Sequence, residues 1–244
     1  MRITRTLRTA PTTRRTLLRA SAATATAGLF AAGSSSVGAT PRILSATDAR
    51  PATPAAALKA LAAGNRRWRT LHQRHPHETV GVRGALVSGQ SPFALILGCI
   101  DSRVPPELVF DQGLGDLMTV RSAGEVLDEA VLGSIAYGVL ELGIPLVMVL
   151  GHQSCGAVAA AVHAEETGES LPAHIQYVAD QIKPAIVHGQ HGDARVDATV
   201  SAQVRLVRSR LVREADLAAK VAAGELAIVG ARYELSTQLV HRVG

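Results

Sequence analysis

Apolar residues along this chain form short continuous runs that alternate with longer stretches of helical spacing. Four runs have the length and composition of buried strands, at residues 93–97, 117–120, 145–150 and 226–230. In residues 128–142, Leu132, Ile135 and Val139 recur on one face of a helix. Helical spacing also predicts helices at residues 55–63, with an extension toward Trp68, and at 156–163, 175–186 and 194–223, and Pro105 with Pro106 opens a short helix.

Strands that alternate with helices are typical of one fold class. Because parallel neighbours need a helical crossover, the pattern predicts an α/β fold with a mainly parallel central sheet flanked by helices. Residues 55–244 are long enough for one domain with a substantial core, and residues 40–54 are expected to be a linker.

The first 39 residues differ from the rest in composition and predict a targeting segment. Residues 13–19 (TRRTLLR) are similar to a twin-arginine export signal, an Ala-rich stretch follows, and residues 37–39 fit a small-residue cleavage site. We therefore expect a signal peptide at 1–39 and an exported protein in the periplasm, the cell wall or the medium. Two alternatives are an uncleaved anchor and a basic arm that binds nucleic acid. Residues 20–39 are weakly apolar for a membrane span, so no stable span is expected after processing.

Charge argues against the nucleic-acid arm. The whole chain has 25 Lys and Arg against 20 Asp and Glu, but the leader contains six arginines and no acid. Without it, 19 basic residues face 20 acidic ones, a net charge near −1. The basic character thus belongs to the leader, and we expect no nucleic-acid partner for the folded domain.

The candidate chemistry lies directly after two of the predicted strands. Cys99 follows the run 93–97, and His152 and Cys155 follow the run 145–150. Residues at the carboxyl ends of such strands face the crevice where ligands bind, so the three side chains are expected to converge. The chain has only these two cysteines, which leaves a disulfide, free thiols or a metal site. Two thiolates and one imidazole are the ligand count of a catalytic zinc with an open fourth position.

The motifs around these residues resemble those of the β-class carbonic anhydrases. Residues 99–107 (CIDSRVPPE) are similar to the first zinc motif of that family, and residues 151–156 (GHQSCG) to the second. The likeness extends from about residue 57 to the end. It implies one Zn²⁺ per chain, CO₂ and bicarbonate as substrate and product, and a homodimer or homotetramer with the active site near the subunit interface.

The resemblance also implies a role for each motif residue. Cys99, His152 and Cys155 would be the zinc ligands, and Asp101 with Arg103 the catalytic dyad. Gln90, Tyr137 and Gly156 would contact the substrate. Two positions depart from patterns common in the family: Met118, where many members have an aromatic residue, and Glu125, where many have an asparagine. Ile96 stands where one subgroup has a tryptophan that helps to close the metal site, so the resemblance favours an open zinc.

The expected chemistry is hydration of CO₂ by a zinc-bound hydroxide, favoured at alkaline pH because two thiolates reduce the charge of the metal. Asp101 would orient the hydroxide, and Arg103 would keep Asp101 ionised and away from the fourth zinc position. A hydrolase acting on carbonyl sulfide or carbon disulfide and a non-catalytic zinc protein are the alternatives. Other histidines are expected to be ordinary surface residues, namely His72, His75, His77, His188 and His191. A proton shuttle is the alternative role for one of them, and the sequence does not select which.

Overall fold

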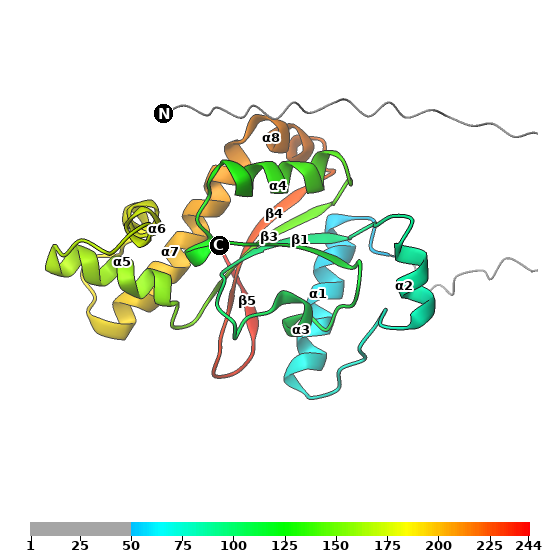
Figure 1. The fold of residues 1–244 in the computed structure, drawn as a ribbon, viewed down its shortest axis with the longest axis horizontal. Coiled ribbons are helices and arrows are strands. Elements are labelled where there is room, and N and C mark those ends of the chain that lie inside the picture. Colours follow the sequence, from blue (N-terminus) through cyan, green and yellow to red (C-terminus); the bar gives the residue numbers. More distant parts are fainter. Residues whose placement is uncertain (1–49) are drawn as a thin grey trace, which may run out of the picture. The chain divides into compact units, whose positions relative to one another are not determined.

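A central five-stranded sheet organises residues 50–244, the part of the chain that the computed structural model describes (Figure 1). Its strands are β1 (Ala94–Gly98), β2 (Leu117–Arg121), β3 (Leu146–His152), β4 (Ala227–Tyr233) and β5 (Val240–Val243). They lie in the order β2-β1-β3-β4-β5. The first four run parallel, and β5 pairs antiparallel with β4. The predicted α/β fold with a mainly parallel sheet is confirmed.

Eight α-helices surround this sheet within the described residues. They are α1 (Pro54–Arg69), α2 (Val80–Leu86), α3 (Pro106–Val109), α4 (Glu129–Leu140), α5 (Gly156–Thr167), α6 (Ile175–Ile182), α7 (Gly192–Arg213) and α8 (Ala215–Ala222). Two 3₁₀ turns, η1 (Ala123–Glu125) and η2 (Lys183–Ala185), complete the set. Figure 1 shows α4, α7 and α8 on one face of the sheet and α1 and α3 on the other.

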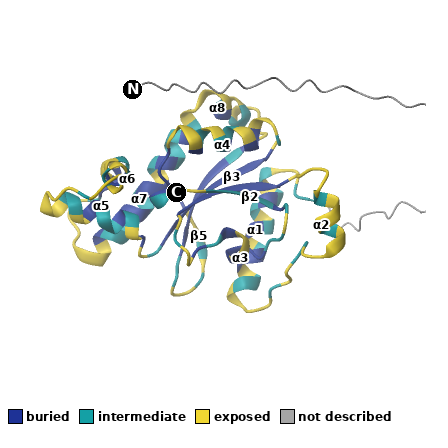
Figure 2. Ribbon diagram, in the orientation of Figure 1, coloured by how far each residue is buried: buried dark blue, intermediate teal, exposed yellow. Residues whose placement is uncertain are grey.

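Side chains of each strand alternate between two cores. Leu95 and Leu97 pack into the cluster beneath α4, α7 and α8, where Ile135 is fully buried. Ile96 and its neighbour Ala94 point to the opposite side, toward α1 and α3. Both faces are therefore covered, which explains why these strands are continuous apolar runs rather than alternating ones (Figure 2). Each fully buried Ile or Leu contributes about 1.5–3 kcal/mol relative to an exposed position.

Parallel pairing brings the ends of two distant strands together. In the register of β1 with β3, Gly98 pairs with Leu150, so both strands leave the sheet at the same edge. Residues 99–103 follow β1 there, and residues 152–156 end β3 and begin α5. The sheet thus positions two segments that are about fifty residues apart in sequence.

Several boundaries differ from the prediction for identifiable physical reasons. The helix predicted at 194–223 is two helices, because Glu214 has an extended backbone between α7 and α8. The helix predicted to reach residue 186 ends at Ile182, since Pro184 cannot donate the next helical hydrogen bond and η2 follows instead. The pattern did not predict α2 or the edge strand β5, both short and largely exposed.

The predicted signal peptide and most of the predicted linker lie outside the described residues. Within residues 50–244, no helix combines the length and the apolar character that crossing a membrane requires.

Candidate zinc centre

Three predicted ligands converge at the shared edge of β1 and β3. Cys99 follows β1, His152 is the last residue of β3, and Cys155 caps the amino end of α5. The ligand atoms of all three lie within 4.8 Å of one another, and the two Sγ atoms are 3.9 Å apart. The cysteines do not form a disulfide. All three side chains are buried, with exposed fractions of 4%, 0% and 1% in chain order.

The imidazole of His152 is oriented for metal binding. Nδ1 lies 2.9 Å from the carbonyl oxygen of Gln153, which requires that Nδ1 carry the proton and donate it. Nε2 is left as the unprotonated nitrogen, and it is buried without a hydrogen-bond partner. A buried acceptor without a partner is costly unless a ligand satisfies it. Together with the two sulfurs, this orphaned nitrogen fits Zn²⁺.

The two sulfurs also favour a cation. The two sulfurs share a hydrogen bond, which is the largest cause that lowers the pKa of Cys99. Together with the backbone N–H of Gly124, 3.4 Å from the sulfur, it outweighs the opposing effect of burial and brings that pKa to about 4. The same shared proton and burial raise the pKa of Cys155. Cys99 is therefore a thiolate at neutral pH, the form that binds a metal ion.

Asp101 and Arg103 form a bidentate ion pair beside the ligands. Arg103 donates from Nε and Nη2 to the two carboxylate oxygens at 2.9 and 2.7 Å, and its backbone N–H donates to Oδ1 at 2.9 Å. These bonds lower the pKa of Asp101 to about 2, so it is ionised throughout the neutral range. Oδ2 of Asp101 lies 3.9 Å from Nε2 of His152.

Sequence reasoning did not assign a role to two further residues of the site. Arg121, at the end of β2, donates to the backbone oxygens of Cys99 and Asp101 at 2.8 and 2.7 Å and so fixes the ligand loop. Glu125 is buried beside the site with an unpartnered Oε1, and burial together with the nearby Cys99 raises its pKa. The only sequence signal for Glu125 was its departure from the family pattern.

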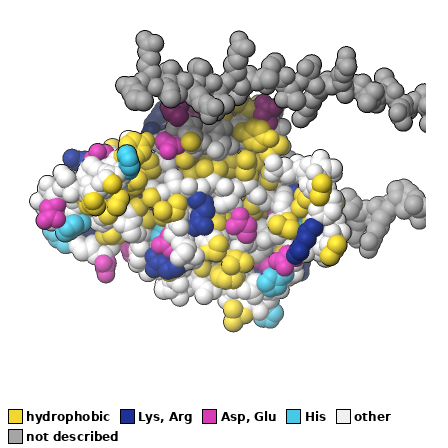
Figure 3. Space-filling model, in the orientation of Figure 1, with side chains coloured by type: hydrophobic (Ala, Val, Ile, Leu, Met, Phe, Trp, Pro, Cys, Tyr) yellow, Lys and Arg dark blue, Asp and Glu magenta, His cyan; other side chains and the backbone are white. Residues whose placement is uncertain are grey.

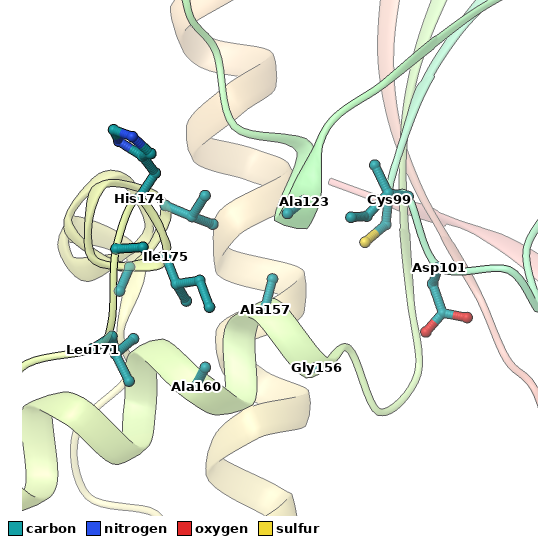
Figure 4. A pocket seen from close by; sticks show the side chains of 13 residues that line it. Cys99, Asp101, Ala123, Gly156, Ala157, Ala160, Leu171, His174 and Ile175 are labelled. Atoms are coloured by element: carbon teal, nitrogen blue, oxygen red, sulfur yellow. The ribbon is translucent and has the colours of Figure 1, made fainter.

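An apolar cavity of about 640 Å³ opens next to the ligands (Figure 4). Cys99, Asp101 and Gly156 line one side of it, and α5, α6 and the segment between them supply most of the remaining wall. Gly156 is the first residue of α5, so the positive end of that helix faces the cavity. Such an end favours an anion such as bicarbonate.

Two of the predicted substrate residues do not line this cavity. Gln90 is exposed in the loop between α2 and β1, and Tyr137 is 49% exposed on α4. A single chain therefore brings Gly156, but neither Gln90 nor Tyr137, to the space beside the ligands.

The visible surface carries basic and acidic side chains interspersed among apolar ones (Figure 3). On this face no continuous basic area of the kind that binds nucleic acid is present among residues 50–244.

The fold and the site together define a class, namely an α/β protein with a buried Cys₂His metal centre at the carboxyl edge of a parallel sheet. Comparison with known proteins gives the family. Residues 94–240 match the family model described as carbonic anhydrase. The chain belongs to the carbonic anhydrase family, β class, and it is an enzyme that hydrates CO₂ with one zinc per chain.

Individual relatives agree with this assignment. The chain is 45% identical to carbonic anhydrase 2 of Mycobacterium tuberculosis over 75% of its own length and 89% of the relative's. It is 43% identical to a carbonic anhydrase of Mycolicibacterium smegmatis, over 75% and 90% of the two chains. Among solved structures, a Coccomyxa β-carbonic anhydrase in complex with acetazolamide aligns with a TM-score of 0.61 at 24% identity, covering 76% of this chain and 86% of that one. A tetrameric β-carbonic anhydrase from Sordaria macrospora aligns with a TM-score of 0.63 at 19% identity, over 75% and 94%.

Proposed function

We propose that this carbonic anhydrase works outside the cytoplasm as an oligomer and uses Asp101 and Arg103 as its catalytic dyad. The geometry of this pair supports its catalytic role. An ionised carboxylate stands 3.9 Å from the ligand nitrogen of His152 and is held by a bidentate guanidinium. A zinc site that only stabilised the fold would need neither group.

Each residue of the site has a defined task. Cys99, His152 and Cys155 would hold Zn²⁺, which would supply a nucleophile by lowering the pKa of water well below its usual value of about 15.7, although two thiolates leave that water less acidic than neutral ligands would. Asp101 would accept a hydrogen bond from the reacting water and so orient it toward the carbon of CO₂. Arg103 holds the carboxylate of Asp101 in place through two hydrogen bonds, which would also keep it away from the metal.

The wall of the cavity suits both substrate and product. Its apolar side chains accept CO₂ at little cost, since the molecule is small and carries no charge. The N-terminal end of α5 at Gly156 then stabilises the negative charge of bicarbonate. Bicarbonate leaves through the open side of the cavity.

Gln90 and Tyr137 fit a role across a subunit interface. Both are exposed and lie outside the cavity of their own chain, while β2 forms an edge of the sheet near the site. We therefore place them in the active site of a neighbouring copy, in a homodimer or homotetramer. The Sordaria relative is described as tetrameric.

The export proposal rests on the leader sequence alone. The twin arginines Arg14 and Arg15, the Ala-rich stretch and the small residues before Thr40 together form a twin-arginine-type signal. A route that carries folded proteins allows the zinc to be inserted in the cytoplasm before transit.

Stopped-flow CO₂ hydration by the zinc-loaded mature protein tests the function directly. The same preparation is assayed with carbonyl sulfide and with carbon disulfide, which use the same ligands but need a different access path. We expect turnover of CO₂ to exceed turnover of either sulfur compound by at least about 100-fold, the scale that differences in substrate fit produce. Faster hydrolysis of a sulfur substrate would assign the chain to that activity instead.

A further inference from the structure

Each turnover of CO₂ hydration releases one proton, and this proton must leave the cavity beside the zinc site. The titratable side chains that line the cavity are Cys99, Asp101 and His174. Cys99 is a zinc ligand. Asp101 is held in place by two side-chain hydrogen bonds from Arg103, at 2.9 and 2.7 Å. Among the cavity residues that this chain itself supplies, His174 is the one titratable side chain that is neither a ligand nor bound to Arg103.

His174 lies on the wall of the cavity opposite the ligands and is itself exposed to solvent. It immediately precedes α6, is exposed, and lines the same cavity as Cys99 and Asp101. Figure 4 shows it on the wall across from those two residues, with Ala123 and Ala157 between. In this view its ring points away from Cys99, toward the outer side of the cavity.

No partner among the described residues holds the imidazole in this position. The ring takes part in none of the hydrogen bonds or ion pairs of residues 50–244, and it does not cap α6. An unrestrained exposed side chain changes between staggered rotamers in picoseconds to nanoseconds. A rotation about χ1 therefore moves the ring between an outward and an inward position at no cost in broken contacts.

The charged groups on the elements packed against α6 do not contact the imidazole of His174. On α5, Glu165 and Glu166 bind Arg195, and His163 faces Glu169 at 3.7 Å. In η1, Glu125 is buried. On α6 itself, Asp180 accepts a hydrogen bond from Gln176, and Lys183 of η2 lines a separate cavity. None of these contacts involves the imidazole of His174.

We propose that His174 is the proton shuttle of this enzyme. In the inward position, neutral imidazole accepts the proton that water gives up at the reaction centre, through water molecules that the cavity is large enough to hold. In the outward position, the imidazolium donates the same proton to a buffer base in solvent and returns to the neutral form. The sum is CO₂ and water giving bicarbonate and a protonated buffer. This step rests on the proposed function, since it requires proton release at the zinc site.

A pair of matched variants tests the shuttle in the zinc-loaded protein. His174→Ala removes the carrier, and His163→Ala removes an exposed histidine of α5 that does not line the cavity. In weakly buffered solution at pH 7.5, we expect His174→Ala to lower kcat about 100-fold, the lower end of the range for a lost acid–base group. We expect kcat/KM to stay within about twofold, because CO₂ conversion precedes proton release. Added imidazole should restore kcat, and His163→Ala should behave as the wild type.

A second measurement does not depend on turnover. NMR relaxation of the His174 ring, whose signals are assigned by their absence in His174→Ala, should report motion between rotamers in picoseconds to nanoseconds, because no contact within residues 50–244 holds the ring. A ring as rigid as the backbone of α6 overturns the proposal. So does a wild-type kcat in His174→Ala, or a parallel loss of kcat and kcat/KM that imidazole does not restore. Absence of CO₂ hydration in the wild type and His163→Ala alike would instead count against the proposed function.

Discussion

Replacing Arg103 by alanine tests the dyad most directly, because it leaves every zinc ligand and Asp101 itself in place. The variant loses the side-chain hydrogen bonds to Asp101 at 2.9 and 2.7 Å and a contact with the backbone oxygen of Ser154 at 3.3 Å. The backbone N–H of residue 103 still donates to Asp101. Asp101 therefore stays near the site but loses the two bonds that fix the plane of its carboxylate.

The expected loss follows from the exposure of the pair. A hydrogen bond to a charged group contributes about 1.5–3 kcal/mol when it is shielded from water. The guanidinium of Arg103 is 52% exposed, so solvent screening reduces the pair to about 1–2 kcal/mol. If this free energy serves to orient the carboxylate of Asp101, its loss lowers kcat/KM about 5- to 30-fold. The pKa of Asp101 rises from about 2 toward its ordinary value near 3.8, so the carboxylate stays ionised and the loss should be equal at pH 7 and pH 9.

Stopped-flow CO₂ hydration and zinc analysis of the same samples measure this effect. Zinc content should remain at one per chain, since Arg103 contacts none of the three ligand atoms. Arg103→Lys should recover only part of the activity, because an ammonium cannot bind both oxygens in the same plane. Arg205→Ala, on the exposed side of α7, is the matched control and should be fully active. Wild-type kcat/KM in zinc-loaded Arg103→Ala would refute the dyad.

The same pair also predicts a stability effect of defined sign. The pKa of Asp101 is lower in the folded protein than its ordinary value. The ion pair therefore stabilises the fold above about pH 4, and this contribution is lost as pH falls toward 2. The difference in thermal stability between the wild type and Arg103→Ala should shrink over that interval.

The remaining predictions concern the metal, a buried acid and the leader. Cys155→Ala should lose both zinc and activity, because two ligands do not hold a catalytic zinc; full zinc in that variant would contradict the ligand assignment. Glu125→Gln should raise the melting temperature by several degrees at pH 8 but not near pH 4. Burial raises the pKa of Glu125, so its buried carboxyl lowers the stability of the folded protein only once pH rises above the ordinary pKa of a glutamate. Equal melting temperatures of the two proteins at pH 8 would contradict this effect. Replacing Arg14 and Arg15 together by lysine should retain the precursor inside the cell, as followed by cell fractionation, and mature protein outside the cytoplasm would exclude the twin-arginine route.

The secondary structure that the sequence predicted correctly is the part with strong local signals. The parallel strands β1, β3 and β4 are almost entirely buried, because both faces of the sheet are covered there. The break at Glu214 had a weaker signal, since the surrounding residues favour a helix. The end of α6 at Ile182 did have a local signal, Pro184, which the prediction of a helix at 175–186 ignored. The edge strand β5 has only four residues, of which the middle two are exposed and only Val243 is buried, too short for a reliable pattern.

The zinc ligands were predictable from sequence for a physical reason. Parallel strands that are neighbours in the sheet end at the same edge, so residues placed directly after two such strands must lie close together. Cys99, His152 and Cys155 occupy those places, and their chemistry selects zinc. The adjacent pair Asp101 and Arg103 follows from the same placement, because a separation of two residues in a turn lets the guanidinium fold back onto the carboxylate.

The environment of that centre was decided only by tertiary structure. The cavity depends on how α6 packs against α5, and nothing in the local sequence of His174 distinguishes it from the other exposed histidines. The burial of Glu125 and the contacts of Arg121 likewise depend on side chains that approach from other elements. Sequence spacing therefore fixes which groups meet at a strand edge, whereas the packing of helices over that edge determines which further side chains reach the site and how much water surrounds them.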